Sequence, residues 1–277
     1  MANTKQPRIL VVAGSDSGGG AGIQADIKTI TVLGGYAMTA VTALTAQNTE
    51  GVEAVMPVPG EFVARQMSIV LDDIGADAIK IGMLANEEIV EAVAGVLEKL
   101  SKKTFIVLDT VMVATQATPE ASPRREGGHA LLEESAIEAL KTKLVPLADV
   151  ITPNIPEAEV LTRQAIKTVA DMKVAAQALL KLGPKAVLMK GGHLEGDEVI
   201  DVLVTPDKET IFQSGRIKTR HNHGTGCTLA SAVAYQLASG LSLEKAVEKA
   251  REYVLKALRS APGFGKGNGP LGHNLTD

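Results

Sequence analysis

Residues 8–22 read RILVVAGSDSGGGAG. The run 8–13 is short, apolar and rich in β-branched residues, which favours a β-strand. A glycine-rich turn over 14–22 follows, and after it the chain takes up a helical spacing of apolar residues. A strand that leads through a tight turn into a helix is the opening half of a parallel βαβ unit. The stretch therefore favours an α/β fold.

The same alternation of strand and helix continues along the chain. Apolar residues recur at spacings of three and four, which indicates helices, over 62–74, 86–100 and 169–182. The expected strands are 8–13, 37–45, 78–83, 105–109, 149–152 and 186–190. We therefore expect a doubly wound, mostly parallel sheet with helices on both faces.

Two segments depart from this rhythm. Over 198–217, two short strand-like runs flank a Pro-Asp turn, so a β-hairpin is expected there. The segment 114–130, ATQATPEASPRREGGHA, is polar and rich in Pro and Gly. Such a stretch is either a lid over a ligand or an ordinary surface loop. No linker or internal repeat divides the chain, so we expect one domain over 1–277.

Composition excludes several classes of protein. The chain has 277 residues, 45% of them hydrophobic, which is enough for a substantial core and too apolar for a disordered or fibrous chain. A formal net charge of −4 argues against binding nucleic acid. No apolar run approaches the roughly 20 residues of a membrane helix. The single cysteine and an N-terminus without a signal peptide's apolar core lead us to expect a cytoplasmic protein.

Ligands of open α/β sheets bind beyond the carboxyl ends of the strands, so the glycine-rich turn 14–22 is a candidate binding loop. Read as Gly20-x-Gly22-x-x-Ala25, it imitates a dinucleotide fingerprint. A dinucleotide site also needs an acid after the next strand, where this chain has the amide of Gln47 and an acid only at Glu50. A plain turn for helix–strand packing explains the glycines equally well, but not the polar Ser-Asp-Ser.

Polar residues lie at the ends of two later strands, and each group of residues has two possible roles. In TPNIPEAE, Asn154 and Glu157 can hold a Mg²⁺ and its waters, or form a helix capping box, which the motif alone favours. Lys190, at the end of the strand AVLMK, can reach a phosphate or simply extend into water.

The stretch HNHGTGCT, residues 221–228, contains the only cysteine. Its Gly-Thr-Gly leads into a predicted helix of small residues that ends at Gly240. The free N–H groups at the start of a helix form an anion hole, which suits a phosphoryl group in transfer. Cys227 lies in the first turn, where the helix dipole is expected to lower its pKa and let it accept a proton from an attacking hydroxyl. The alternatives are a small buried side chain and a zinc site with His221 and His223, which lacks a clear fourth ligand.

Together these motifs resemble a known family. AGSDSGGGAGIQADIKT, TALTAQNT, KIGML, LDTVMVA, ITPNIPEAE, LMKGGH and HGTGCT occur in this order over nearly the whole chain. They are similar to the hydroxymethylpyrimidine/phosphomethylpyrimidine kinases of thiamine biosynthesis, which have the ribokinase-like fold. The resemblance implies an ATP- and Mg²⁺-dependent enzyme that phosphorylates 4-amino-5-hydroxymethyl-2-methylpyrimidine and then its monophosphate.

The resemblance also implies roles for particular residues. Gln47 would read the pyrimidine, whose adjacent donor and acceptor edges suit a primary amide. The phosphate-side group comprises Gly224, Thr225, Gly226, the base Cys227 and Lys190. The remaining matches are Gly14, Ala21, Met83 and Val111 around the pyrimidine and Asp109, Asn154 and Glu157 around the metal.

The chain departs from the family at two places. The last helix has Arg251 where the family usually has a lysine, and arginine keeps the charge but not its geometry. After VMVA the family tends to read Lys-Ser-Gly-Asp, whereas this chain has Thr-Gln-Ala-Thr and extra residues that include Arg124 and Arg125. We therefore assign the lid no contacts.

Other functions stay open beside this one. A pyridoxal kinase on the same scaffold is the nearest rival, although pyridoxal-type relatives tend to lack the glutamine at position 47. A nucleotide-binding regulator without turnover and a dinucleotide-dependent dehydrogenase are weaker alternatives. The expected partners are the small pyrimidine and ATP, with no nucleic acid and no membrane. The oligomeric state stays open, with a homodimer as one candidate.

Overall fold

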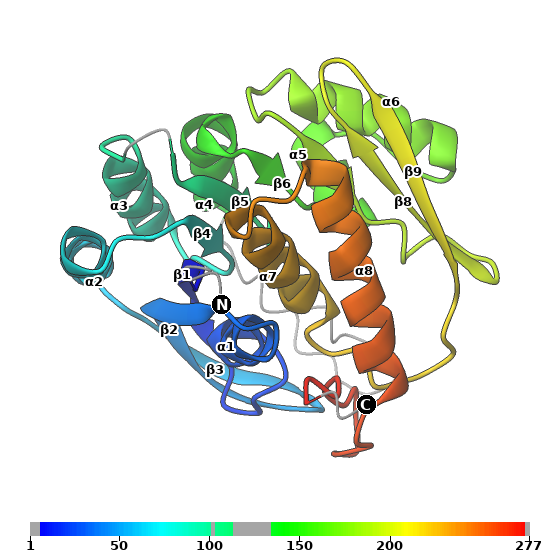
Figure 1. The fold of residues 1–277 in the computed structure, drawn as a ribbon, viewed down its shortest axis with the longest axis horizontal. Coiled ribbons are helices and arrows are strands. Elements are labelled where there is room, and N and C mark those ends of the chain that lie inside the picture. Colours follow the sequence, from blue (N-terminus) through cyan, green and yellow to red (C-terminus); the bar gives the residue numbers. More distant parts are fainter. Residues whose placement is uncertain (1–5, 101–102, 113–133, 275–277) are drawn as a thin grey trace, which may run out of the picture.

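The computed structural model describes residues 6–100, 103–112 and 134–274, and within them the strands form one sheet (Figure 1). The strand order is β3-β2-β1-β4-β5-β6-β7-β8-β9. Pairing is parallel from β2 to β7 and antiparallel for β3, β8 and β9. The bounds are β1 (Arg8–Ser15), β2 (Tyr36–Asn48), β3 (Gly51–Pro57), β4 (Ala78–Ile81), β5 (Phe105–Leu108), β6 (Val150–Ile151), β7 (Val187–Met189), β8 (Glu198–Val204) and β9 (Glu209–Gly215).

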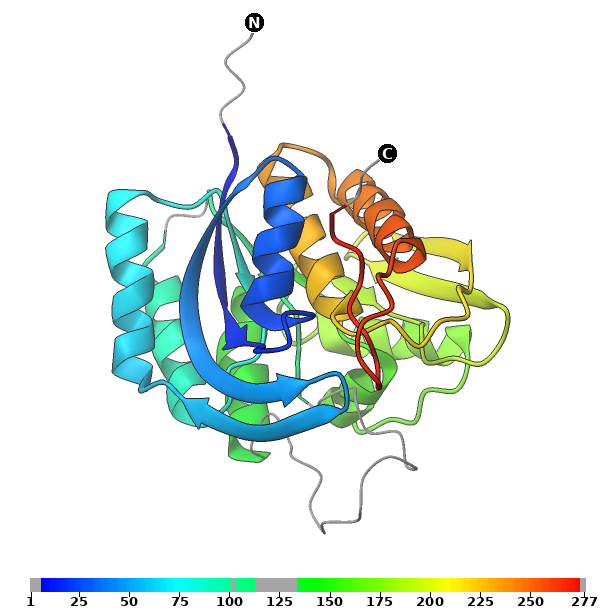
Figure 2. The same cartoon turned by 90° about the horizontal axis from the view of Figure 1, so that it is seen from below.

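Helices cover both faces of this sheet (Figures 1 and 2). Alternate residues of β1 point to opposite faces, and both sets are buried, as expected for a parallel strand inside a layered fold. One face packs against α1 (Gly22–Val32), α7 (Thr225–Ala238) and α8 (Leu243–Arg259). The other packs against α2 (Gly60–Asp73), α3 (Glu87–Leu97), α4 (Glu134–Ala139), α5 (Ile155–Thr162) and α6 (Val169–Leu180). None of the described helices is both long and apolar enough to cross a membrane.

The strand order reverses at β1. The chain passes from β1 to β2 on one side, and from β3 it returns to β4 on the other side of β1. The loops that leave the carboxyl ends of neighbouring strands diverge at such a point and leave a crevice. The doubly wound sheet and the β8–β9 hairpin predicted from the sequence are confirmed.

Two details differ from the sequence predictions, and a third prediction falls outside the described residues. The strand β3 was missed because it is an edge strand whose residues are mostly exposed, so it lacks an apolar pattern. As a result β2 is longer than expected, and Gln47 lies inside it, opposite Val52, instead of beyond its end. The predicted loop or lid over 114–130 lies outside the described residues.

A C-terminal segment, 264–273, packs back onto the body of the molecule between α7 and α8 (Figure 2, red). The N–H of Asn268 donates to the Thr49 carbonyl, and the N–H of His223 donates to the Gly269 carbonyl. His273 is buried, and its Nε2 is 2.9 Å from Oγ1 of Thr228 at the start of α7. The segment therefore joins the β2–β3 turn to the loop before α7.

The buried His273 predicts acid sensitivity. Burial, together with the charge of Lys28, lowers the pKa of His273 to about 4, whereas an unfolded histidine titrates near 6.5. The unfolded chain therefore binds a proton first as pH falls, and stability is lost between these values, by about 2–3 kcal/mol at pH 4.5. Urea unfolding at pH 7 and pH 4.5 should show a smaller loss for His273→Gln than for the unmodified protein. Equal losses in the two proteins would contradict this assignment.

Candidate active site

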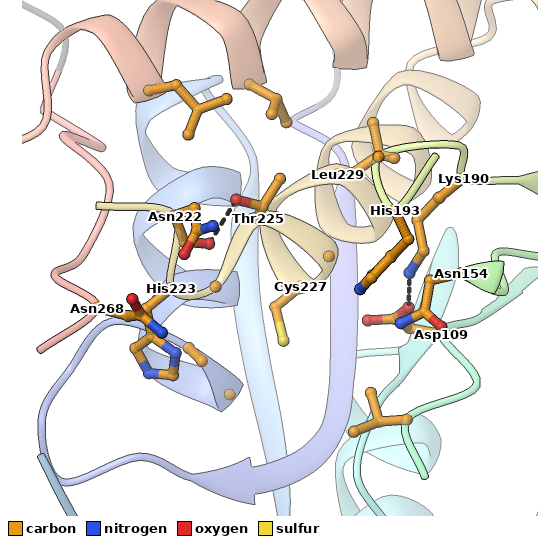
Figure 3. A pocket seen from close by; sticks show the side chains of 18 of the residues that line it. Asp109, Asn154, Lys190, His193, Asn222, His223, Thr225, Cys227, Leu229 and Asn268 are labelled. Carbon is orange, nitrogen blue, oxygen red and sulfur yellow. Dashed lines mark hydrogen bonds and ion pairs between the residues drawn. The ribbon is translucent and has the colours of Figure 1, made fainter. Parts of the chain in front are cut away.

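A pocket of about 590 Å³ opens beyond the carboxyl ends of the parallel strands (Figure 3). Its size is typical of a site for a small molecule. Every residue to which the sequence analysis gave a role is among its lining residues: Gly14, Ala21, Gln47, Met83, Asp109, Val111, Asn154, Glu157, Lys190, Gly224, Thr225, Gly226 and Cys227. Residues from seven separate segments of the chain, one of them the strand β2, thus meet in one cavity.

The amino end of α7 faces this pocket, and its geometry depends on Gly224. This N-cap residue has φ +88°, and a Cβ there would lie 1.9 Å from the Gly20 carbonyl oxygen, so only glycine fits. No side chain caps the helix. Within the described residues, the N–H groups of Gly226 and Cys227 donate to no backbone carbonyl, which leaves them available to an anion.

Lys190 and Asp109 form an ion pair beside this helix end. Asp109 follows β5 and Lys190 follows β7, and their Oδ1 and Nζ are 2.9 Å apart (Figure 3). Thr152 Oγ1 donates to the same Oδ1 at 3.0 Å. Burial alone would raise the pKa of Asp109, but the charges of Lys190 and Lys80 hold it below its usual range. A fixed carboxylate and a fixed ammonium therefore lie beside the amino end of α7.

Asn154 and Glu157 form the capping box at the start of α5. The Asn154 side chain accepts from the Glu157 N–H, and Glu157 Oε2 accepts from the Asn154 N–H at 2.8 Å and from Thr110 Oγ1 at 3.1 Å. The capping interpretation is confirmed. Burial raises the pKa of Glu157 to about 7, with Lys190 opposing and Asp109 adding to the shift.

The capping box does not exclude a metal nearby. Among the described residues, Asp109 accepts its side-chain bonds through Oδ1 and Glu157 through Oε2, so Oδ2 and Oε1 are left for water or a cation. The described residues contain no group of three or more His, Cys, Asp or Glu side chains that could hold a metal by themselves. This donor set fits Mg²⁺, which keeps several waters and takes only one or two carboxylates.

Cys227 points into the pocket between these groups and the glycine-rich loop (Figure 3). The expectation of a lowered thiol pKa was wrong. Burial, only partly offset by Lys80, raises the pKa of Cys227 to about 11 although the Gly22 N–H also contacts the thiol. The loss of solvation in the half-buried first turn outweighs the helix dipole, and the group is a neutral thiol near pH 7.

Sequence reasoning missed one ion pair and one histidine–carboxylate hydrogen bond in the wall of the pocket. Arg251 donates to Asp201 Oδ2 at 2.5 Å and to Ser214 Oγ at 3.1 Å, so its charge is already neutralised in the pocket wall. Asp16 bonds to His223 Nε2 at 2.8 Å, so this histidine is tied to a carboxylate. The polar Ser-Asp-Ser in the glycine-rich turn was the available signal for Asp16, since packing alone does not explain it.

Comparison with known proteins agrees with this geometry. A family model described as phosphomethylpyrimidine kinase matches residues 16–272. The chain belongs to this family. It is 45% identical over 267 residues to the hydroxymethylpyrimidine/phosphomethylpyrimidine kinase of Rhizobium meliloti, with 95% of this chain and 96% of that protein covered. It is 46% identical to the thiamine biosynthesis bifunctional protein ThiED of Geobacter sulfurreducens, of which it spans only 52%.

Solved structures of relatives have the same ribokinase-like fold. The phosphomethylpyrimidine kinase of Clostridium difficile superposes with a TM-score of 0.77 at 41% identity, covering 91% of this chain and 99% of that one. The pyridoxal kinase of Bacillus subtilis, solved as an ADP complex, gives 0.85 at 34% identity, covering 97% and 98%. Members of the family are phosphotransferases, so the fold, the family and the class of enzyme predicted from the sequence are confirmed.

Proposed function

We propose that the protein transfers the γ-phosphate of ATP to the hydroxymethyl group of 4-amino-5-hydroxymethyl-2-methylpyrimidine, and then phosphorylates the monophosphate to the diphosphate, for thiamine biosynthesis. The observation that carries the proposal is one cavity lined by the helix end at Gly226, the Lys190–Asp109 pair and the amide of Gln47. Phosphoryl transfer requires positioning and charge stabilisation, and the first two supply both.

The phosphate end of the pocket would work through fixed donors. The N–H groups of Gly226 and Cys227 would donate to oxygens of the transferred phosphoryl group. Lys190 lies close to this helix end, because a Cβ on Gly226 would be 3.3 Å from Lys190 Nζ. Its ammonium group would bind the same phosphoryl oxygens as a point charge. Asp109 and Glu157 would hold Mg²⁺ together with its waters, beside Asn154. When bound, the ion would neutralise phosphate charge.

The acceptor end would hold a flat ring. Gly14, Ala21, Met83 and Val111 line the cavity around Gln47 and offer apolar contacts to both sides of a heterocycle. The ring hydroxymethyl group would then point towards Cys227, which is the nearest candidate to accept its proton.

The cellular location and the oligomeric state of the enzyme are also proposals. A cytoplasmic location is in keeping with the single cysteine, which cannot form a disulfide within the chain. A homodimer is the assembly that we would test first, by sedimentation of the purified protein.

Product analysis by mass spectrometry tests the proposed function. The purified protein would be incubated with ATP, Mg²⁺ and either the pyrimidine or pyridoxal. The pyrimidine diphosphate is the expected product. Pyridoxal phosphate alone would favour the second candidate, which the likeness to pyridoxal kinases supports. No product from either substrate would favour a non-catalytic nucleotide-binding role.

Gln47→Met is expected to lower kcat/KM for the pyrimidine by about 10- to 100-fold, because one or two hydrogen bonds to the ring are lost. The Kd for ATP should not change, since residue 47 is placed at the acceptor end. Steady-state kinetics with both acceptors, and calorimetry with ATP, measure these effects. An equal loss towards pyridoxal would contradict a role in reading the ring.

A further inference from the structure

The wall of the pocket behind Gln47 is built by a hydrogen-bonded pair, Asp16 and His223. These residues come from opposite ends of the chain, and their side chains are 3% and 11% exposed. Asp16 Oδ2 lies 2.8 Å from His223 Nε2 and also accepts from the N–H groups of Gly20 and Ala21. The amide nitrogen of Gln47 lies 3.4 Å from the same His223 Nε2.

The position of one hydrogen decides what His223 can offer to Gln47. A carboxylate oxygen 2.8 Å away requires a hydrogen on Nε2, whether the ring is neutral or charged. Burial tends to raise the pKa of Asp16, but the bonds from His223 and from the loop hold it below its usual value, so the oxygen is an acceptor. Nε2 therefore has no lone pair left for an N–H of the Gln47 amide.

The other side of the amide faces a hydroxyl whose hydrogen is already used. Thr45 Oγ1 lies 2.9 Å from the Ser15 carbonyl oxygen and 3.2 Å from Gln47 Oε1. A carbonyl oxygen can only accept, so the hydroxyl hydrogen of Thr45 is donated to Ser15. Towards Gln47 the hydroxyl can therefore act only as an acceptor. A half-turn of the amide about its last bond exchanges oxygen and nitrogen at no cost in shape. The amide oxygen then faces the hydrogen of His223 Nε2, which it shares with Asp16, in place of an N–H facing an N–H, and the amide nitrogen donates to the Thr45 hydroxyl.

We propose that Asp16 and His223 fix the side-chain amide of Gln47 with its oxygen towards His223 and its nitrogen towards Thr45, and thereby select the acceptor ring. The outer edge of the amide then presents one acceptor and one donor to the pocket in a fixed order. An aminopyrimidine offers the complement, an amino group beside a ring nitrogen, whereas pyridoxal has no such pair. This inference rests on the proposed function and names the residues that set its specificity.

Packing keeps the imidazole in place. A Cβ on Gly20 would lie 2.5 Å from His223 Cδ2 and 3.2 Å from the Pro270 side chain, so the ring fills the space that the glycine leaves. The N–H of His223 is held by the Gly269 carbonyl at 3.1 Å. His223 is thus a positioning residue, because it acts on the ring of the substrate through Gln47.

A matched pair of variants tests the proposal. His223→Gln keeps an N–H donor near the position of Nε2, whereas His223→Met has similar length and no donor. His223→Met should lower kcat/KM for the pyrimidine by about 10-fold or more and leave kcat/KM for pyridoxal nearly constant. His223→Gln should restore most of the pyrimidine preference. ATP affinity and thermal unfolding, measured for both variants, show whether each is folded.

A double-mutant cycle separates this role from a structural one. If His223 acts through Gln47, then His223→Met should not change the ratio of pyrimidine to pyridoxal activity further in a Gln47→Met background. Equal ratios in His223→Met and His223→Gln, or additive losses in the cycle, would overturn the proposal.

Two further results keep the inference distinct from the proposed function. If the unmodified protein neither binds nor phosphorylates the pyrimidine, the proposed function fails and the inference fails with it. If that protein is active, only the variants decide the inference. If His223→Met does not fold, nitrogen NMR of the unmodified protein labelled at histidine replaces the kinetic test. The proposal requires a hydrogen on Nε2 of His223, and the absence of this hydrogen would contradict it.

Discussion

Cys227→Ala is expected to lower the turnover of the pyrimidine roughly 10²-fold or more while changing KM little, because the thiol would act on the proton of the attacking hydroxyl and not on ground-state binding. The raised pKa of about 11 gives this expectation a pH dependence. Near pH 7 only about one molecule in 10⁴ carries the thiolate, and this fraction grows about tenfold with each pH unit. Single-turnover rates of the unmodified enzyme should therefore rise steeply between pH 7 and pH 9.

The same measurement on two variants shows whether Cys227 causes that rise. Cys227→Ala and the near-isosteric Cys227→Ser should both give flatter profiles over this range, since neither forms a thiolate. If the variants keep the slope of the unmodified enzyme, another group accepts the proton. Unchanged turnover in Cys227→Ala would remove the assigned role altogether.

Lys80→Met is expected to destabilise the protein by about 3–5 kcal/mol, because it leaves a buried carboxylate without its partner. Lys80 and Asp26 are both fully buried, and their charged atoms are 3.0 Å apart. Ser231 Oγ donates to Asp26 at 2.6 Å, so the pair joins β4 to α1 and α7, two helices whose amino ends line the pocket. Urea unfolding monitored by circular dichroism measures the loss.

Two controls make this result specific. Lys245→Met removes a cation from an exposed pair with Glu248 and should cost less than about 1 kcal/mol. The double variant Lys80→Met with Asp26→Asn removes both charges, and it should recover a large part of the loss. If the two single lysine variants are equally stable, or if the double variant is the sum of its parts, the buried pair does not have the assigned role in stability.

The strands and helices of the sheet could be predicted because their apolar spacing is strong. β1 is buried on both faces and reads as a continuous apolar run, β4 is apolar apart from the buried Lys80, and α3 has a clear helical spacing. The edge strand β3 could not be found in this way, because an exposed strand is held by its hydrogen bonds to β2 more than by an apolar pattern.

The candidate site shows the same division between local and distant information. The helix end at Gly224 and the capping box at Asn154 follow from neighbouring residues, so their motifs were sufficient. The pKa of Cys227 is raised mainly by burial under segments that are distant in sequence, with Lys80 opposing the shift and Asp26 and Asp109 adding to it, so the local helix dipole gave the wrong direction. The partner of His223 lies 207 positions away, a distance that no local motif reveals.

The C-terminal segment 264–273 has a consequence for how the enzyme is made. It holds the loop before α7 through the Gly269 carbonyl and the side chain of His273. Protein synthesis releases these residues last of those described, and the earlier sheet can form before them. Until residue 273 has left the ribosome, the turn before α7 therefore lacks these contacts, even in a nascent chain whose sheet is nearly complete.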